Sequence, residues 1–158
     1  MLSETVVRIE LTFILFFAVY SCATILVRAQ STDLVGRWKV ELTFDQQPRI
    51  SLNFEAEDSG KGSFLLEGRK SNWAEPPRPS AAKWTESGEK HVTFSGPVNF
   101  PIGNVGRQSG TLVFKGRFEK DNLISGEVAF FSAGQDPFDP NVTPVKTGKF
   151  KATRVNSD

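Results

Sequence analysis

The chain has 158 residues, which is enough for one domain with a sizeable core and too few for two. Lysine and arginine number 19 while aspartate and glutamate number 18, so no strong net charge attracts nucleic acid or an anionic membrane surface. The 14 phenylalanines and three tryptophans concentrate the apolar side chains in rigid rings, which either fill a core or line an apolar cavity.

An apolar segment near the N-terminus indicates export. Residues 11–27 are uncharged and lie between two arginines, as the h-region of a signal peptide does. Val27 and Ala29 would occupy the two specificity positions of a signal peptidase site. We therefore expect a signal peptide over residues 1–29, a β-barrel domain over residues 30–158, and a secreted or periplasmic location.

Two alternatives stay open for this segment. If residues 11–27 are retained, they are just long enough to anchor the protein in a membrane, and this is the only membrane contact that we expect. Cys22 is the other candidate, because the preceding Val19-Tyr20-Ser21 resembles a lipoprotein processing site. Cys22 is also the single cysteine, so the rest of the chain forms no internal disulfide.

From Leu34 onward, apolar residues alternate with polar ones at a period of two, which is typical of strands with one buried and one wet face. The apolar positions carry even numbers in every run, and turn residues separate the runs. Examples from the eight runs are Trp38, Phe54, Phe64, Trp84, Phe94, Phe114, Phe130 and Phe150. Because eight strands in series leave two edges unless they close, we predict an all-β fold, an eight-stranded antiparallel up-and-down β-barrel. A β-sandwich is the alternative.

Three connections are longer than the others, over residues 70–81, 100–110 and 132–145. Successive hairpins alternate between the two ends of an up-and-down barrel, so all three are expected to crowd one mouth. The Gly96-Pro97 pair, just before the second of them, is expected to bend or interrupt its strand. Loops on a rigid scaffold commonly carry recognition, although plain surface variation explains such loops equally well.

The first predicted strand contains Gly36-Arg37-Trp38, and the last predicted strand ends on Arg154. This pair resembles the Gly-x-Trp signature and closing basic residue of lipocalin-like, calycin-type barrels. It is also similar to secreted bacterial barrel domains without assigned function. The resemblance implies that Trp38 plugs one end of the barrel with Arg154 across its ring. Independently, antiparallel closure of the last strand on the first would place residue 154 opposite residues 36–38, and the contact would be worth about 0.5–2 kcal/mol.

No catalytic constellation stands out. His91, the single histidine, has the outward parity of its strand, where a surface side chain is expected. Clusters of cysteine and histidine suited to zinc are absent from the sequence, and Asp136 and Asp139 lack the ligand spacing of a known calcium loop. We therefore expect no enzyme activity, no metal and no cofactor.

Two functions remain as hypotheses. The first is that the interior binds a small apolar or amphipathic ligand. Its lining would be the inward rings Phe54, Phe64, Trp84, Phe94, Phe114 and Phe130, which would otherwise simply fill the barrel. The alternative is a protein-binding module, inhibitor-like or envelope-associated, that uses the loop-rich mouth. Its expected anchors are Trp73 and Phe138, because aromatic residues dominate interface energetics.

Overall fold

The computed structural model describes residues 32–45, 47–67, 78–88, 90–102 and 106–155, with the side chains of 32 and 100–102 excepted. The chain separates into two units, residues 1–30 and residues 31–158, and everything below concerns the second unit. The predicted signal peptide, with Cys22, and the predicted anchor Trp73 lie outside the described residues. In the described part of the chain, no helix has both the length and the apolar character needed to cross a membrane.

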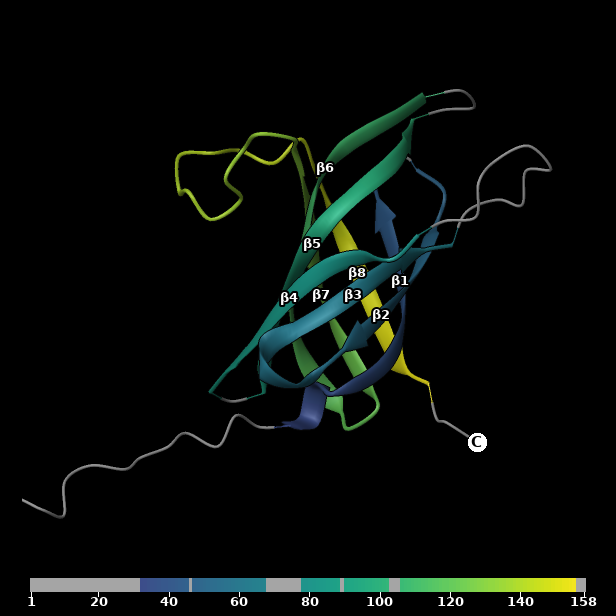
Figure 1. The fold of residues 1–158 in the computed structure, drawn as a ribbon, viewed down its shortest axis with the longest axis vertical. Helices are drawn as coiled ribbons and strands as arrows, with labels where there is room; N and C mark the ends of the chain where they lie inside the picture. Colours follow the sequence, from purple (N-terminus) through teal and green to yellow (C-terminus); the bar gives the residue numbers. More distant parts are fainter. Residues whose placement is uncertain (1–31, 46, 68–77, 89, 103–105, 156–158) are drawn as a thin grey trace, which may run out of the picture. The chain divides into compact units, whose positions relative to one another are not determined.

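Eight antiparallel strands follow one another in chain order and close into a barrel (Figure 1). Two short 3₁₀ turns accompany them, η1 (Thr32–Leu34) before the first strand and η2 (Asp58–Gly60) after the second. The strands are β1 (Gly36–Phe44), β2 (Ile50–Ala56), β3 (Lys61–Leu66), β4 (Ser80–Ser87), β5 (His91–Ile102), β6 (Gly106–Lys120), β7 (Leu123–Ser132) and β8 (Lys146–Arg154).

Closure is made by β1 and β8, which pair from Trp38↔Arg154 to Phe44↔Gly148. The ladder between the first and last strands removes the two sheet edges that an open eight-stranded meander would expose. The prediction of an all-β, eight-stranded antiparallel barrel is confirmed, and the sandwich alternative is excluded.

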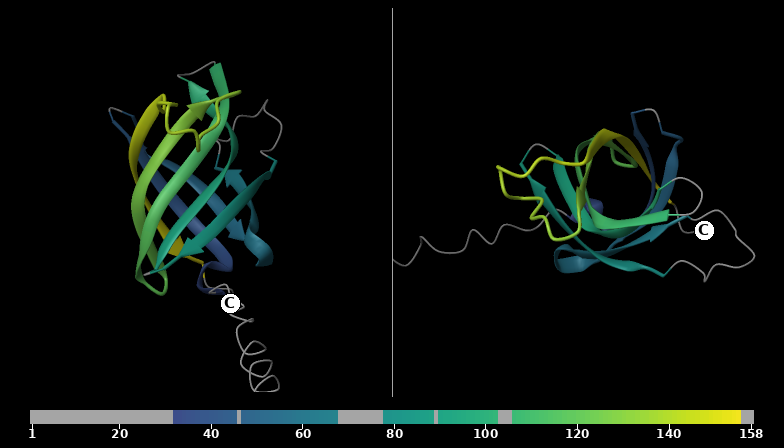
Figure 2. Two further views of the ribbon diagram at one scale, coloured as in Figure 1. Left: turned by 90° about the vertical axis from the view of Figure 1, so that its left-hand side faces the viewer. Right: turned by 90° about the horizontal axis from the view of Figure 1, so that it is seen from above.

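The period of two in the sequence becomes an inside and an outside. On β1 the buried residues are Trp38, Val40, Leu42 and Phe44, and the residues between them are exposed or half-buried. Leu34 of η1 joins the same core with no exposed surface, so η1 covers one end of the barrel. We call this end, which also carries the β2–β3, β4–β5 and β6–β7 turns, the closed end. The opposite end, with the other four connections, is the loop-bearing end (Figure 2).

The connection between β5 and β6 differs from the long loop expected over residues 100–110. The two strands continue as one hairpin and pair as far as Ile102↔Gly106. Pro97 does not interrupt β5. Its carbonyl oxygen points away from β6, toward β4, where it accepts a hydrogen bond from Ser80 Oγ at 2.6 Å. The backbone N of Pro97 lies on the same side, so the ladder with β6 does not need the N–H that proline lacks.

The β7–β8 connection also departs from the expected crowding at the mouth. Both views in Figure 2 show it outside the wall, beside β6 and β7. Val113 on β6 and Phe131 on β7 point outward by their parity, yet they are only 3% and 6% exposed and lie apart from the central core cluster. Covering these two apolar side chains gives the loop a physical reason to lie on the wall rather than over the opening.

Candidate functional site

Three of the rings that were expected to line a ligand site form a stack in the middle of the barrel. Phe94 lies between the other two: its ring centroid is 4.7 Å from that of Phe54 and 4.6 Å from that of Phe114, with interplanar angles of 5° and 12°. Phe64 meets all three edge-on, at centroid distances of 5.4 to 6.2 Å. Phe150 closes the other side at 5.5 Å from Phe94 and 5.1 Å from Phe114. Stacked and edge-to-face contacts of this kind are favourable packing arrangements for aromatic rings.

Inward-facing glycines make room for these rings. A Cβ added at Gly62 would stand 2.9 Å from the Phe54 ring, and one added at Gly116 would stand 2.7 Å from the Phe150 ring. A Cβ added at Gly96 would stand 3.0 Å from the Phe64 ring. The inward positions predicted from the sequence included only apolar side chains and omitted these glycines. Their even numbers, shared with the phenylalanines, were the available signal.

The remaining two rings of the expected set belong to the same buried core. Trp84 is the cross-strand partner of Phe94, the central ring of the stack. Trp84 has its indole Nε1 within hydrogen-bonding distance of two carbonyl oxygens, Glu57 at 2.9 Å and Lys61 at 2.7 Å, which flank the η2 turn. Phe130 packs where Gly110 leaves space, 2.5 Å from the position of an added Cβ. The structure therefore brings all six rings into one buried core. Phe54, Phe64, Phe94 and Phe114 contact one another ring to ring within it.

The exposure of these rings shows what the interior contains. Phe94, Phe114 and Phe130 are 0% exposed, Phe54 and Phe64 are 1%, and Trp84 is 3%. A side chain beside a void that admits water would keep accessible surface toward that void. These rings therefore fill the barrel around them, at the close packing usual in protein interiors. No polar or charged residue is buried in the described part of the chain. The indole N–H groups of the buried Trp38 and Trp84 already donate to backbone carbonyl oxygens.

Trp38 and Arg154 lie together at the closed end. The guanidinium carbon Cζ is 4.4 Å from the centroid of the Trp38 ring, a cation–π distance. Arg154 also donates to the carbonyl oxygens of Asp33 and Val35, the latter at 2.7 Å. Trp38 Nε1 donates to the Leu34 carbonyl oxygen at 2.8 Å. These bonds tie the segment before β1 to the last residue of β8, across the end of the barrel.

At the loop-bearing end, the most exposed large apolar side chain of the described residues is Phe138, at 62%. It lies in the β7–β8 loop, which short-range hydrogen bonds hold in shape. Asp136 Oδ1 accepts from the Phe138 backbone N–H, and Asp139 Oδ1 accepts from the Asn141 backbone N–H, both at 2.9 Å. Such bonds from aspartate to the backbone two residues on are typical of turns.

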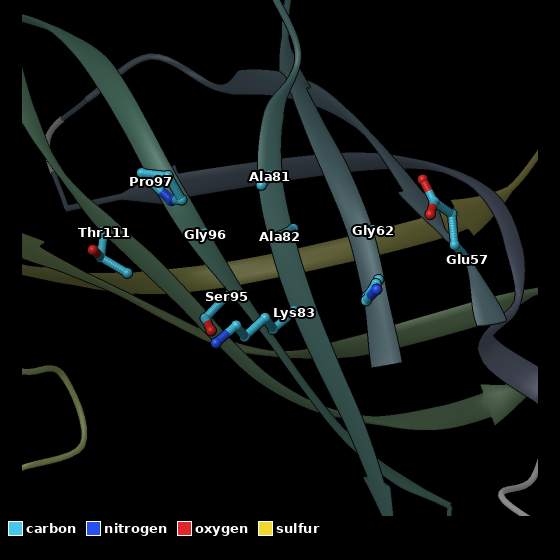
Figure 3. A pocket seen from close by; sticks show the side chains of 10 residues that line it. Glu57, Gly62, Ala81, Ala82, Lys83, Ser95, Gly96, Pro97 and Thr111 are labelled. Atoms are coloured by element: carbon cyan, nitrogen blue, oxygen red, sulfur yellow. The ribbon is translucent and has the colours of Figure 1, made fainter. Parts of the chain in front are cut away.

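A shallow groove crosses the outer wall where β4 separates from β5 (Figure 3). β4 pairs with β5 only from Lys83↔Ser95 onward, and small outward residues, Ala81 and Pro97, lie in the gap beyond. Lys61 and Lys83 stand directly opposite each other across β3 and β4. Glu57 also lines the groove, so its charged side chains are one carboxylate and two lysines.

The titratable side chains are dispersed over the outside. His91 Nδ1 lies 3.1 Å from the Gly88 carbonyl oxygen in the β4–β5 turn, where the ring is exposed. No group of three or more histidine, cysteine, aspartate or glutamate side chains that could hold a metal occurs among the described residues. One pKa shift is clear: on the wall, hydrogen bonding and charge attraction from Lys149 lower the pKa of Glu127, with the Lys149 Nζ to Glu127 Oε1 distance at 2.7 Å.

Comparison with known proteins adds little to this picture. No family model matches the chain, and no curated protein matches it. Among solved structures, a redesigned β-barrel aligns with 85% of this chain and 100% of its own length, at 11% sequence identity and a TM-score of 0.42. A match at this level carries no argument about function. What the structure itself shows is the fold, an eight-stranded antiparallel β-barrel.

Proposed function

We propose that this chain is an exported, non-enzymatic β-barrel that binds a protein partner through its β7–β8 loop. The observation that carries the proposal is Phe138, a large ring left 62% exposed on a loop that is otherwise held by hydrogen bonds. Aromatic side chains supply much of the energy of protein interfaces, and exposing one to water has no benefit for folding.

The loop is suited to this role because its shape is set before binding. Gln135 Oε1 accepts from the Ser132 N–H at 2.9 Å, and the Val145 N–H donates to the Phe130 carbonyl oxygen at 2.8 Å, so both ends of the loop are attached to β7. A preformed loop loses little conformational entropy when it binds.

The packed interior weighs against the other hypothesis, in which a small apolar ligand binds among the rings. A ligand at Phe94 or Phe114 would have to displace rings that already contact one another at 4.6 Å. Displacing such packing costs the dispersion and burial energy of the rings before any ligand contact is made. The protein-binding alternative requires no such rearrangement.

Affinity capture from the medium or envelope fraction of the producing cells tests the proposal. Immobilised wild-type protein is compared with the Phe138→Ala variant, with the Trp73→Ala, Phe138→Ala double variant, and with Lys151→Ala as a matched surface control. We expect wild type and Lys151→Ala to retain the same partner. Phe138→Ala should retain at least about tenfold less of it, because truncating a hot-spot residue costs about 2 kcal/mol or more, which lowers the affinity about 30-fold. Equal recovery by the double variant would contradict the proposal. Saturable binding of one fatty acid per chain would instead favour the hypothesis that the interior binds a small apolar ligand.

We further infer a calycin-type kinship and export. The kinship is supported by the Gly36-Arg37-Trp38 motif and by Arg154, whose guanidinium carbon lies 4.4 Å from the centroid of the Trp38 ring. The apolar run over residues 11–27 supports export. The intact mass of the protein recovered from the producing cells tests the second inference. Loss of residues 1–29 supports cleavage after Ala29, whereas a full-length mass indicates an anchor and a lipid-modified Cys22 indicates lipoprotein processing.

A further inference from the structure

The hairpin of β5 and β6 reaches beyond the strands on either side of it. β5 and β6 pair continuously to Ile102↔Gly106, whereas β4 pairs with β5 only as far as Ser95, and β7 pairs with β6 only from Gly110. The end of the hairpin, residues 97–102 and 106–109, is therefore a two-stranded ribbon that projects at the loop-bearing end (Figure 1). We call it the β5–β6 ribbon.

The β5 edge of this ribbon faces away from β6. The Pro97 carbonyl oxygen accepts from Ser80 Oγ of β4 at 2.6 Å, so the backbone polar atoms of Pro97 point outward from the ribbon. In a strand, the N and O atoms of one residue point to the same edge, and this direction repeats at every second residue. Asn99 and Pro101 therefore present their backbone atoms at the same edge as Pro97.

Two of these three positions are prolines and have no N–H to donate. Along the β5 edge of the ribbon, Asn99 is left as the single N–H donor between residues 97 and 101. The Asn99 side chain is itself engaged within the ribbon, where its Oδ1 accepts from Ser109 Oγ at 2.7 Å. A strand that approached this edge would meet carbonyl oxygens and few donors.

The opposite edge, along β6, is covered in a different way. The Ser109 carbonyl oxygen accepts from the Ala133 N–H at 3.1 Å, and Gln108 Nε2 donates to Ser132 Oγ at 3.2 Å. The beginning of the β7–β8 loop thus occupies the edge next to Ser109. The two edges of one ribbon are protected by different means, proline on one and chain on the other.

We propose that Pro97 and Pro101 prevent the β5 edge of the ribbon from pairing with the same edge of a second copy of this chain. Unpaired strand edges are templates for pairing with another chain, and proline on the edge is a known means of protection. Two copies related by a twofold axis would otherwise join their ribbons into one four-stranded sheet, an isologous contact. The inference rests on backbone directions alone and is independent of the partner proposed for Phe138.

The test replaces both prolines by a residue that favours strands. In the Pro97→Thr, Pro101→Thr variant, the edge regains two N–H donors, carried by a residue type that is enriched in strands. We expect wild type to sediment as a monomer across the accessible concentration range. The double variant should shift toward the dimer mass as its concentration rises. The matched control is Pro137→Thr, Pro140→Thr in the β7–β8 loop, which makes the same chemical change away from the ribbon and should stay monomeric.

A third change identifies the surface that associates. Adding Asn99→Pro to the double variant removes the central donor of the same edge and should restore the monomer. The proposal is overturned if the folded double variant stays monomeric, if wild type is already a dimer, or if Asn99→Pro leaves the association intact. Should the double variant fail to fold by circular dichroism, the single variant Pro101→Thr, which leaves the Ser80 contact to Pro97 in place, decides the matter by the same criteria.

Discussion

The two ends of the barrel are held by different kinds of contact. At the closed end, Arg154 bonds to backbone carbonyls more than 100 residues earlier in the chain, with sequence separations of 119 and 121. In the β7–β8 loop, the bonds from Asp136 and Asp139 span two residues each. Long-range bonds of the first kind depend on the whole barrel, whereas short-range bonds of the second kind set the shape of one loop.

This difference indicates where the chain can change without loss of the fold. A loop that keeps its shape by local bonds can alter its exposed side chains at little cost in stability, which suits a recognition surface. The closed end and the ring stack have no such freedom, because each side chain there contacts elements from several parts of the chain. Four predictions test this contrast, and they are taken from the largest expected effect to the smallest.

The largest effect is expected from one phenylalanine in each region. Phe94→Ala removes the central ring of the stack and should lower the free energy of unfolding by about 3–5 kcal/mol. Phe138→Ala makes the same chemical change on the exposed loop and should stay within about 0.5 kcal/mol of wild type. Urea unfolding of both variants measures the difference. A similar loss in both would show that the loop supports the barrel and would remove the contrast.

The second largest loss of stability is expected at Gly126, a glycine of β7 that lies close to the backbone of β6. A Cβ at Gly126 would stand 2.2 Å from the Lys115 carbonyl oxygen and 2.5 Å from Gly116 Cα, so the backbone must move. We expect Gly126→Ala to cost about 1–3 kcal/mol, the usual range for overpacking. Gly88→Ala is the control, because nothing lies within 4 Å of an added Cβ there. If the two variants have the same thermal midpoint, the close approach of β6 and β7 at Gly126 is not required.

The third largest loss of stability is expected from the contact between Arg154 at the end of β8 and Trp38 on β1. Arg154→Ala removes a cation–π contact with Trp38 and the bonds to Asp33 and Val35, and we expect a loss of about 2 kcal/mol. Lys151→Ala, on the same strand with an exposed side chain, should change stability by less than about 0.5 kcal/mol. Arg154→Lys keeps the charge but loses the planar guanidinium, so it should recover only part of the difference. Full recovery by lysine would show that charge alone matters.

The smallest effect is expected at the exposed pair on the wall. Because Lys149 lowers the pKa of Glu127, Lys149→Ala should raise that pKa toward the ordinary value of glutamate, and NMR titration of the carboxyl measures it. The sign follows from the direction of the shift. A carboxyl with a lowered pKa in the folded state adds stability above its unfolded pKa and loses it as the pH falls through the folded one. Unchanged titration in Lys149→Ala would show that the pair does not form in solution.

Much of the fold could be predicted because the inward side of each strand follows a local rule. Even-numbered residues such as Phe54, Phe94 and Phe114 were assigned to the interior from the period of two, and they lie there. Val113 and Phe131 break the rule, since they are apolar at odd positions, and this break was the available signal that something covers the outer wall. The alternation within the strands does not otherwise predict that the β7–β8 loop lies on the outer wall.

The candidate site was less predictable because it depends on relations between strands. An inward phenylalanine looks the same in a sequence whether it lines a cavity or meets another ring. The register decides which: Gly116 pairs with Gly126, and Gly126 pairs with Phe150, so one row across three strands leaves room for one ring. The β5–β6 ribbon also depends on a relation between strands. Its glycine-rich residues belong to strands because β5 and β6 pair in register as far as Ile102↔Gly106.

The sequence by itself determined the number of strands, the side that each strand buries, and the meeting of Trp38 with Arg154, because alternation within a strand and antiparallel order around a closed barrel are sufficient for these. The tertiary structure alone decided that the rings pack on glycines instead of enclosing a void. It also decided that the β7–β8 loop lies beside β6 and β7 on the outer wall, and that Pro97 and Pro101 lie along the same edge of β5. These features depend on the stagger between neighbouring strands, and no period within a single strand records that stagger.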